Sequence, residues 1–246
     1  MAHRRALGIG RVFAFTFLLW FRGLLPFTFL AVLFYSPRIL HRIEWRPRFN
    51  DSAYVWETLL VDQLLLMPVV AAVIHSVLER LRGRRAGIGA CLRVAISRWL
   101  PTVGVTLYVH LLVVLAMCPF LFLAQVHPAW TIGAGICGVL VLGRYWLALP
   151  AAVVERKGIG ASLRRSVDLS RGSKGPIFTI VAVFYSGWFI AVSMLTFTTP
   201  YRFDTGWIVL GVLRGTLMAV ASAVAYYDLK VAKEGVPTED LVRVFG

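Results

Sequence analysis

The chain has 246 residues, of which 59% are hydrophobic and 15% charged, and its mean hydropathy is +0.75. A soluble domain contains about 25% charged residues and always keeps part of its chain on a water-exposed surface. The composition therefore argues against a soluble enzyme and a disordered chain, and it predicts a multi-pass membrane protein. Three explanations of the net charge of +14 then have to be compared: binding to nucleic acid, binding to anionic lipid, and the topology of the chain in the membrane.

Six segments are predicted to cross a membrane as helices, since a spanning helix needs about 20 apolar residues. The first is the shortest and contains two prolines. In chain order the segments are 24–40, 54–78, 100–124, 130–154, 176–198 and 206–228. We therefore expect an all-α membrane protein with one integral membrane domain over 1–246 and a short cytoplasmic tail over 231–246. Pro68 and Pro150 are expected to kink their helices, because proline removes a backbone donor and crowds the previous turn.

Lys and Arg are distributed unequally between the two sides of this six-span chain. The N-terminus, segments 79–98 and 155–174 and the C-terminal tail share one side and contain eighteen of them, whereas the other side contains five. Cytoplasmic loops are enriched in Lys and Arg, so we expect both termini in the cytoplasm of a bacterium and the protein in its inner membrane. Nucleic-acid binding is not expected, because the cations are divided among short loops.

An internal repeat precedes three pairs of spans. Gly87-Ile-Gly-Ala-Cys-Leu-Arg93 and Gly158-Ile-Gly-Ala-Ser-Leu-Arg164 are identical at six of seven positions with an offset of 71, and Gly8-Ile9-Gly10 is a weaker third copy. Each copy follows cations and precedes two spans. The sequence therefore predicts three repeats of an interfacial amphipathic helix plus a helical hairpin, over roughly 4–80, 81–155 and 156–235.

The third interfacial helix has two distinct predicted faces. Ile159, Leu163 and Val167 form an apolar stripe, while Arg164, Asp168 and Arg171 form a polar one. A helix of this kind lies in the headgroup plane of a membrane. Two interpretations stay open: the helix binds anionic lipid or a protein partner, or it only positions the next span.

Ionisable residues within spans are costly and are functional candidates by default. The candidate intramembrane polar site consists of Asp62, His110, Arg144 and Arg214. Asp62 and Arg214 each lie eight residues from the outer end of a span, so they could pair. One arginine would then need backbone carbonyls, water or an anionic substrate. The alternatives are a polar pathway or anion site and a structural ion pair with a snorkelling arginine.

Motifs of known catalytic or metal chemistry are not found. The three cysteines have no paired spacing, and no HExxH, GxSxG or P-loop pattern occurs. The acidic residues lie mostly at the membrane edges, and no cluster of carboxylates or histidines is predicted. We therefore predict no catalytic residue, no cofactor and no metal site.

Two stretches of the chain match a family pattern. Residues Pro150–Gly172 contain a Pro–Ala–Ala–Val–Val–Glu span end followed by the third interfacial helix, and the last span ends with Tyr226-Tyr227-Asp228-Leu229-Lys230 before Glu234-Gly235. These stretches resemble the glycerophosphoryl diester phosphodiesterase membrane domain superfamily. The resemblance implies a six-helix membrane protein; the phosphodiesterase barrel of some family members has no counterpart here, so its activity is not implied. Residues 173–176 depart from the family pattern.

The residues shared with this family suggest an ion-pair cluster at the cytoplasmic ends of spans 4 and 6. Such pairs would connect different repeats and hold the third interfacial helix to the bundle. The candidate cluster consists of Glu155, Arg156, Arg164, Arg165, Asp168 and Asp228.

Two functions from different classes follow from the sequence. The favoured one is a non-catalytic scaffold or accessory subunit that contacts anionic lipid headgroups of the bilayer and possible protein partners in the membrane. The alternative is a transporter or permease-like protein for a small anion or lipid headgroup, using Arg144 and Arg214. A membrane-embedded lipid enzyme is the weakest reading, since no carboxylate or histidine cluster supports it.

Overall fold

The computed structural model describes residues 8–44, 52–84, 86–155, 158–198 and 204–235, and within these ranges the side chains of 38–44, 52–60, 62–63, 192, 195–198 and 204–208 are not described. The described residues form helices and turns and contain no strand. The helices are α1 (Ile9–Glu44), α2 (Ser52–Leu81), α3 (Ile88–Ser97), α4 (Trp99–Leu123), α5 (Trp130–Tyr145), α6 (Ala148–Val154), α7 (Ile159–Ser170), α8 (Lys174–Thr198) and α9 (Asp204–Glu234).

Six of the described segments are long and apolar enough to cross a membrane, as expected from the sequence. They lie in α1, α2, α4, α5 continued by α6, α8 and α9. This architecture is compatible with a multi-pass membrane protein, because each spanning helix satisfies its backbone hydrogen bonds internally.

From residue 8 onward, where the description of the chain begins, the expected interfacial helix of the first repeat is not a separate element. Instead α1 begins at Ile9 and continues to Glu44, so the first span starts well before residue 24. The physical reason is the composition of residues 12–21, which are apolar except for Thr16 and contain neither glycine nor proline. Nothing in that stretch ends a helix, whereas a turn at Arg98 separates α3 from α4.

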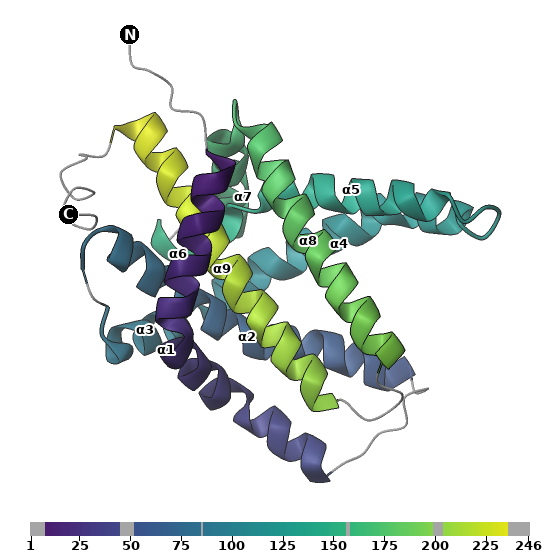
Figure 1. The fold of residues 1–246 in the computed structure, drawn as a ribbon, viewed down its shortest axis with the longest axis horizontal. Coiled ribbons are helices and arrows are strands. Elements are labelled where there is room, and N and C mark those ends of the chain that lie inside the picture. Colours follow the sequence, from purple (N-terminus) through teal and green to yellow (C-terminus); the bar gives the residue numbers. More distant parts are fainter. Residues whose placement is uncertain (1–7, 45–51, 85, 156–157, 199–203, 236–246) are drawn as a thin grey trace.

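The centre of the molecule is the contact between α2 and α9 (Figure 1). Both helices are buried over several turns and meet through small side chains, among them Ala71, Ala72, Ala219 and Ala223. Small residues let two helices approach closely in a membrane protein. Helices α4 and α5 pair as a hairpin that extends to one side of this centre (Figure 1).

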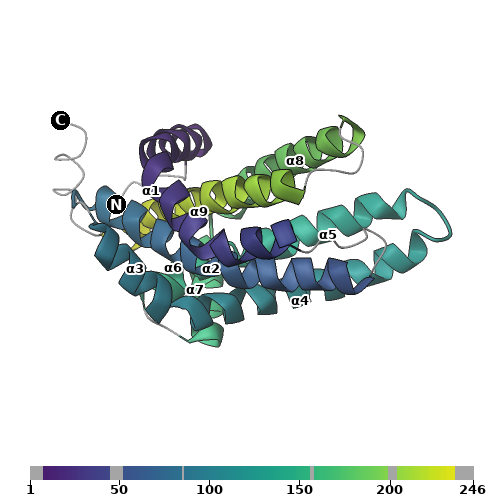
Figure 2. The ribbon, with the colours of Figure 1, turned by 90° about the horizontal axis from the view of Figure 1, so that it is seen from below.

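The short helices gather at one end of the molecule. Figure 2 shows α3, α6 and α7 at this end, which we name the α7 end, and the connection between α4 and α5 at the opposite end. That connection, residues 124–129, contains no Lys or Arg. This connection therefore lacks the cations that segment 79–98 contains at the α7 end.

Pro150 explains why the fourth span is divided into α5 and α6. Helix α5 ends at Tyr145 and α6 begins at Ala148, so that Trp146 and Leu147 interrupt the helix. Proline at 150 cannot donate to the Trp146 carbonyl, four residues earlier, and its ring crowds that oxygen. The kink expected at Pro150 is thus present. Pro68, in contrast, lies inside an uninterrupted α2.

The face of α7 that packs on the bundle was not predicted, because the sequence assigned its apolar stripe only to a helix in the membrane headgroup plane. Only Leu163 of that stripe is buried, while Ile159 is exposed. Instead, three serines at a spacing of four residues face the bundle, together with Leu163 and Leu169; they are Ser162, Ser166 and Ser170. Small side chains allow close helix packing, and each serine hydroxyl donates to a backbone carbonyl. Helix α7 is therefore packed into the bundle through a polar but small face.

Candidate functional site

Helix α7 contacts α4, α5, α6 and α9, and the charged residues around it form two groups. One group is centred on Glu155, at the end of α6, and we name it the Glu155 network. The other lines a pocket between α7, α5 and α4, which we name the arginine pocket. The two groups differ in their balance of charge.

Glu155 is the centre of the first group and its side chain is only 9% exposed. Its Oε1 accepts a hydrogen bond from Arg165 Nε at 2.8 Å and one from the Tyr226 hydroxyl at 2.5 Å. Lys230 Nζ lies 3.6 Å from the same oxygen. These contacts join the end of α6 to α7 and α9, and they involve two residues of the expected ion-pair cluster, Glu155 and Arg165.

A second carboxylate completes the Glu155 network. Glu234 forms an ion pair with Arg165 and lies 4.0 Å from Lys230. Burial alone would lower the pKa of Arg165, but hydrogen bonds to Glu234 and Glu155 and their negative charges outweigh burial and raise its pKa. Among the described residues the network thus contains two carboxylates and two cations, so their charges balance.

The end of α9 also stabilises the last turn of α7. Lys233 Nζ donates to the carbonyl oxygens of Asp168 at 2.9 Å and Arg171 at 2.7 Å. Carbonyls at a helix C-terminus have no partner within the helix and carry partial negative charge, so a cation there is favourable. Helix α7 is consequently held to α9 at its C-terminal turn as well as through Arg165.

Asp228 pairs with a different helix from Glu155. Its Oδ1 lies 3.8 Å from the Arg11 guanidinium of α1, and its side chain is 20% exposed. The expected contact between distant parts of the chain is present, but it joins α9 to α1. Arg11 was not among the expected partners.

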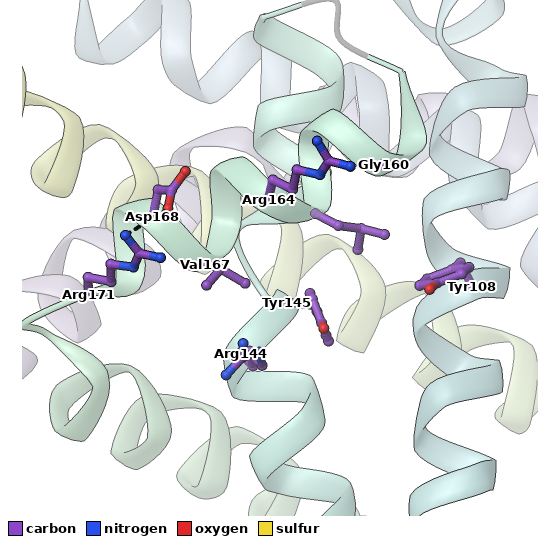
Figure 3. A pocket seen from close by; sticks show the side chains of 9 residues that line it. Tyr108, Arg144, Tyr145, Gly160, Arg164, Val167, Asp168 and Arg171 are labelled. Carbon is purple, nitrogen blue, oxygen red and sulfur yellow. Dashed lines mark ion pairs between the residues drawn. The ribbon is translucent and has the colours of Figure 1, made fainter.

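The arginine pocket has a volume of about 520 Å³. Figure 3 shows Arg164 and Asp168 on α7 with Arg171 directly after it, Arg144 and Tyr145 at the end of α5, and Tyr108 on α4. Gly160, Leu163 and Val167 complete the lining. The break before α6 ends α5 beside α7, and Ser166 fixes this position by donating to the Arg144 carbonyl at 3.0 Å.

Positive charge is in excess in this pocket. Asp168 lies 3.5 Å from Arg171 and offsets that one arginine. Arg144 and Arg164 have no carboxylate within ion-pair distance in the described part of the chain. Two guanidinium charges are therefore uncompensated, and guanidinium groups bind carboxylates and phosphates in bidentate geometry. The arrangement is suited to an anion.

The other residues of the candidate intramembrane site lie elsewhere. His110 Nδ1 is 2.8 Å from the Thr106 carbonyl on its own helix. The Arg214 guanidinium lies over the Tyr185 and Trp188 rings of α8, 4.9 and 5.0 Å from their centres, an arrangement in which a cation is attracted to the ring faces.

Two expected site residues are not covered by the described side chains. They are Asp62 and Arg156, and the pairing of Asp62 with Arg214 stays a prediction. Of the three residues of the intramembrane site whose side chains the structure describes, Arg144 is the one that lines the arginine pocket. The pocket thus combines one residue from that set with Arg164 and Asp168 of the expected ion-pair cluster.

Several residues at these sites were not identified from the sequence as functional. Tyr226 and Glu234 lie in the stretch that resembles the family pattern. That resemblance was the one feature of the sequence that could have indicated a role for them. Lys230 lies one turn before Glu234, a spacing that favours ion pairs on a helix surface. Tyr108 had no such signal, since a tyrosine in an apolar span usually faces lipid or other helices.

Comparison of the chain with family models, with curated proteins and with solved structures finds no match. The resemblance to the glycerophosphoryl diester phosphodiesterase membrane domain superfamily stays a prediction. The function is therefore argued from the geometry of the two charged groups.

Proposed function

We propose that this chain is a non-catalytic multi-pass membrane protein that binds an anionic lipid headgroup in the arginine pocket and acts as a scaffold or accessory subunit in the membrane. The observation that supports it is the excess of positive charge in a pocket of about 520 Å³. Pockets for small ligands have volumes of about 300–1,000 Å³. In the neighbouring Glu155 network the described charges balance, and we assign to this network the role of holding α7 in place.

The orientation is part of the proposal. The α7 end faces the cytoplasm of a bacterial inner membrane, where the excess of Lys and Arg is expected. A pocket at that end meets the headgroups of the inner leaflet, which attracts basic segments through its anionic lipids.

We also propose that α3–α5 and α7–α9 are two copies of one unit. Each starts with a short helix that begins at the isoleucine of Gly-Ile-Gly and is followed by two apolar helices. The first copy, before α2, has lost its separate short helix. Asp168 and Arg171 correspond to Ser97 and Leu100 at the offset of 71, so the other copy lacks this pair of charged residues.

The test is the lipid that the protein retains. The full chain is purified in mild detergent, and bound lipids and co-purifying proteins are identified by mass spectrometry. We expect enrichment of anionic over zwitterionic lipid in the wild-type protein, and loss of this enrichment in the double variant Arg144→Gln/Arg164→Gln.

Arg93→Gln is the matched control. Arg93 occupies the position of Arg164 in the other copy of the repeat, is exposed on α3 and does not line the pocket. The control should retain anionic lipid like the wild type. Equal enrichment in the double variant and the wild type would contradict headgroup binding, and a protein that co-purifies with no partner would contradict the scaffold role.

A further inference from the structure

We propose that α1 binds a spanning helix of another membrane protein, and that a carboxylate near the middle of that helix pairs with Arg22. The inference rests on the scaffold role in the proposed function and specifies the chemistry of the partner, but it does not involve the arginine pocket. It is carried by an arginine of an apolar spanning helix for which the described part of the chain supplies no partner.

Arg22 is exposed on α1, within the apolar segment Ile9–Pro37 that is long enough to cross a membrane. None of the described residues forms an ion pair, a hydrogen bond or a cation–π contact with its guanidinium. Its neighbours Phe21 and Leu25 are also exposed, but apolar side chains face lipid on any spanning helix and do not indicate a partner. The charge does, because an arginine within a spanning segment almost always faces a polar partner, the interior of a bundle or water.

Helix α1 packs on α9 (Figure 1), and two contacts between them show the level at which Arg22 lies. Arg11 pairs with Asp228, and Trp20 Nε1 donates a hydrogen bond to Thr216 Oγ1 at 3.1 Å. Thr216 lies twelve residues from Asp228 and twelve from the start of α9, which is about 18 Å in each direction along the helix. Arg22 follows Trp20 by two residues, so it lies about half-way across a hydrocarbon core that is about 30 Å thick.

Arg214 shows how the chain accommodates another cation at this level. It precedes Thr216 by two residues on α9, and its guanidinium lies over the Tyr185 and Trp188 rings, 4.9 and 5.0 Å from their centres. The faces of the rings attract the cation. The described residues offer Arg22 no such contact, so the group that offsets its charge has to come from outside the described part of the chain.

A carboxylate of a different protein fits this position best. Carboxylates pair with guanidinium groups through two parallel hydrogen bonds, whereas a lipid phosphate lies in the headgroup layer, away from the level of Thr216. A second copy of this chain supplies no free carboxylate among the described side chains, because each of these already lies within 4.0 Å of a cation. They are Glu79, Glu155, Asp168, Asp228 and Glu234.

Association with a designed helix tests the inference in vesicles of phosphatidylcholine, a lipid without net charge. The full chain is reconstituted with a labelled polyleucine helix that carries either Glu or Gln at its centre, and energy transfer measures their association. We expect the Glu helix to bind about tenfold more tightly than the Gln helix, which is the effect of one charged hydrogen-bonded pair. Arg22→Gln should remove this difference.

Two further variants distinguish the pair from a general effect on the fold. Arg214→Gln removes the cation that already has ring partners at the same level, so the preference for the Glu helix should stay at about tenfold. Arg22→Glu reverses the charge and should bind a helix with a central Lys more tightly than the Glu helix. A folding defect cannot produce that new preference.

Cross-linking in the native membrane identifies what covers α1. A photoreactive amino acid replaces Leu25, which lies three residues after Arg22 and is 86% exposed. We expect a cross-link to a protein whose spanning segment contains Asp or Glu near its middle, and loss of this product when Arg22→Gln is added. Cross-links to lipid alone, or to a helix without a carboxylate, overturn the inference.

The outcomes separate the inference from the proposed function. Equal association of the Glu and Gln helices with the wild-type chain overturns the inference, while the anionic lipid retained by the arginine pocket is measured independently. A cross-link to a second copy overturns a different protein as the partner. A protein that co-purifies equally with Arg22→Gln and the wild type supports the scaffold role and overturns the place assigned to α1.

Discussion

Charged residues on and around α7 have two different roles, which their partners distinguish. Glu155 is nearly buried and has Arg165, Tyr226 and Lys230 as partners. An ion pair of this kind is costly to break, because removing one member leaves the other partly buried without its partner. Arg144 and Arg164, in contrast, are exposed and can be changed without leaving a buried charge.

Glu155→Gln should therefore destabilise the fold more than changes at exposed pairs. We expect the free energy of unfolding to fall by about 2 kcal/mol, because Arg165 loses a charged hydrogen bond in a protected position. The measurement is chemical unfolding in mild detergent, followed by circular dichroism.

The control for this change is Asp168→Asn. Asp168 and Arg171 form an ion pair on the same helix with 54% and 73% exposed side chains, and exposed pairs contribute about 0–1 kcal/mol. If both variants unfold alike, the Glu155 network does not hold α7 in place.

The sequence permitted part of this network to be predicted. A cluster that includes Glu155 and Arg165 follows from charges at the ends of a span and of an interfacial helix, but the sequence did not show which residues pair. Partners such as Arg11, for Asp228, could not be identified, because they depend on which helices become neighbours. The position of Arg144 beside α7 also could not be predicted, because it depends on the break between α5 and α6 near Pro150.

At the scale of elements, α3 and α7 show how two related segments diverge. Cys91 and Ala95 are buried in α3 at the positions of Ser162 and Ser166 in α7, so both helices use small residues toward the bundle. The apolar periodicity predicted both helices, but it did not predict which face of α7 packs on the bundle. Serine at a spacing of four residues is typical of close helix packing in a membrane protein, and in α7 this spacing marks the buried face.

The contact between α5 and α8 depends on a glycine next to Arg144. A side chain at Gly143 would overlap the Phe178 ring of α8. We expect Gly143→Val to lower stability by about 1–3 kcal/mol through overpacking, seen as a lower unfolding temperature in detergent.

Gly135→Val is the matched control on the same helix. Gly135 is exposed, and no heavy atom lies within 4 Å of the position that its Cβ would occupy. It should leave the unfolding temperature close to that of the wild type. A similar loss in both variants would mean that helix propensity, and not the contact with Phe178, explains the effect.

At the scale of the whole molecule, the six apolar helices were predictable because a membrane requires a long apolar run for each span. The connection at 124–129, which contains no Lys or Arg, lies at the opposite end of the molecule from the basic α7 end. This agrees with the unequal division of Lys and Arg between the two predicted sides of the membrane. The arrangement of helices around α2 and α9 was not predictable, since apolar residues that face lipid and those that face other helices have the same composition.

Labelling of single cysteines tests the orientation. In a chain whose three native cysteines are replaced, His127→Cys lies in the connection between α4 and α5, and Arg84→Cys lies at the α7 end. A membrane-impermeant maleimide should label His127→Cys in intact bacterial cells and Arg84→Cys only after permeabilisation, because the Lys- and Arg-rich side is expected inside. The reverse pattern would place the arginine pocket on the outer side.

The attachment of α7 has a thermodynamic consequence for any ligand of the arginine pocket. Its C-terminal carbonyls are bound by Lys233, and Arg165 ties its middle to α6 and α9. The backbone that carries Arg164 and Arg171 is thus ordered before a ligand arrives. Association then has to restrict only the arginine side chains, at about 0.5–1.5 kcal/mol for each one immobilised, and the entropy of ordering a whole helix is not lost on binding.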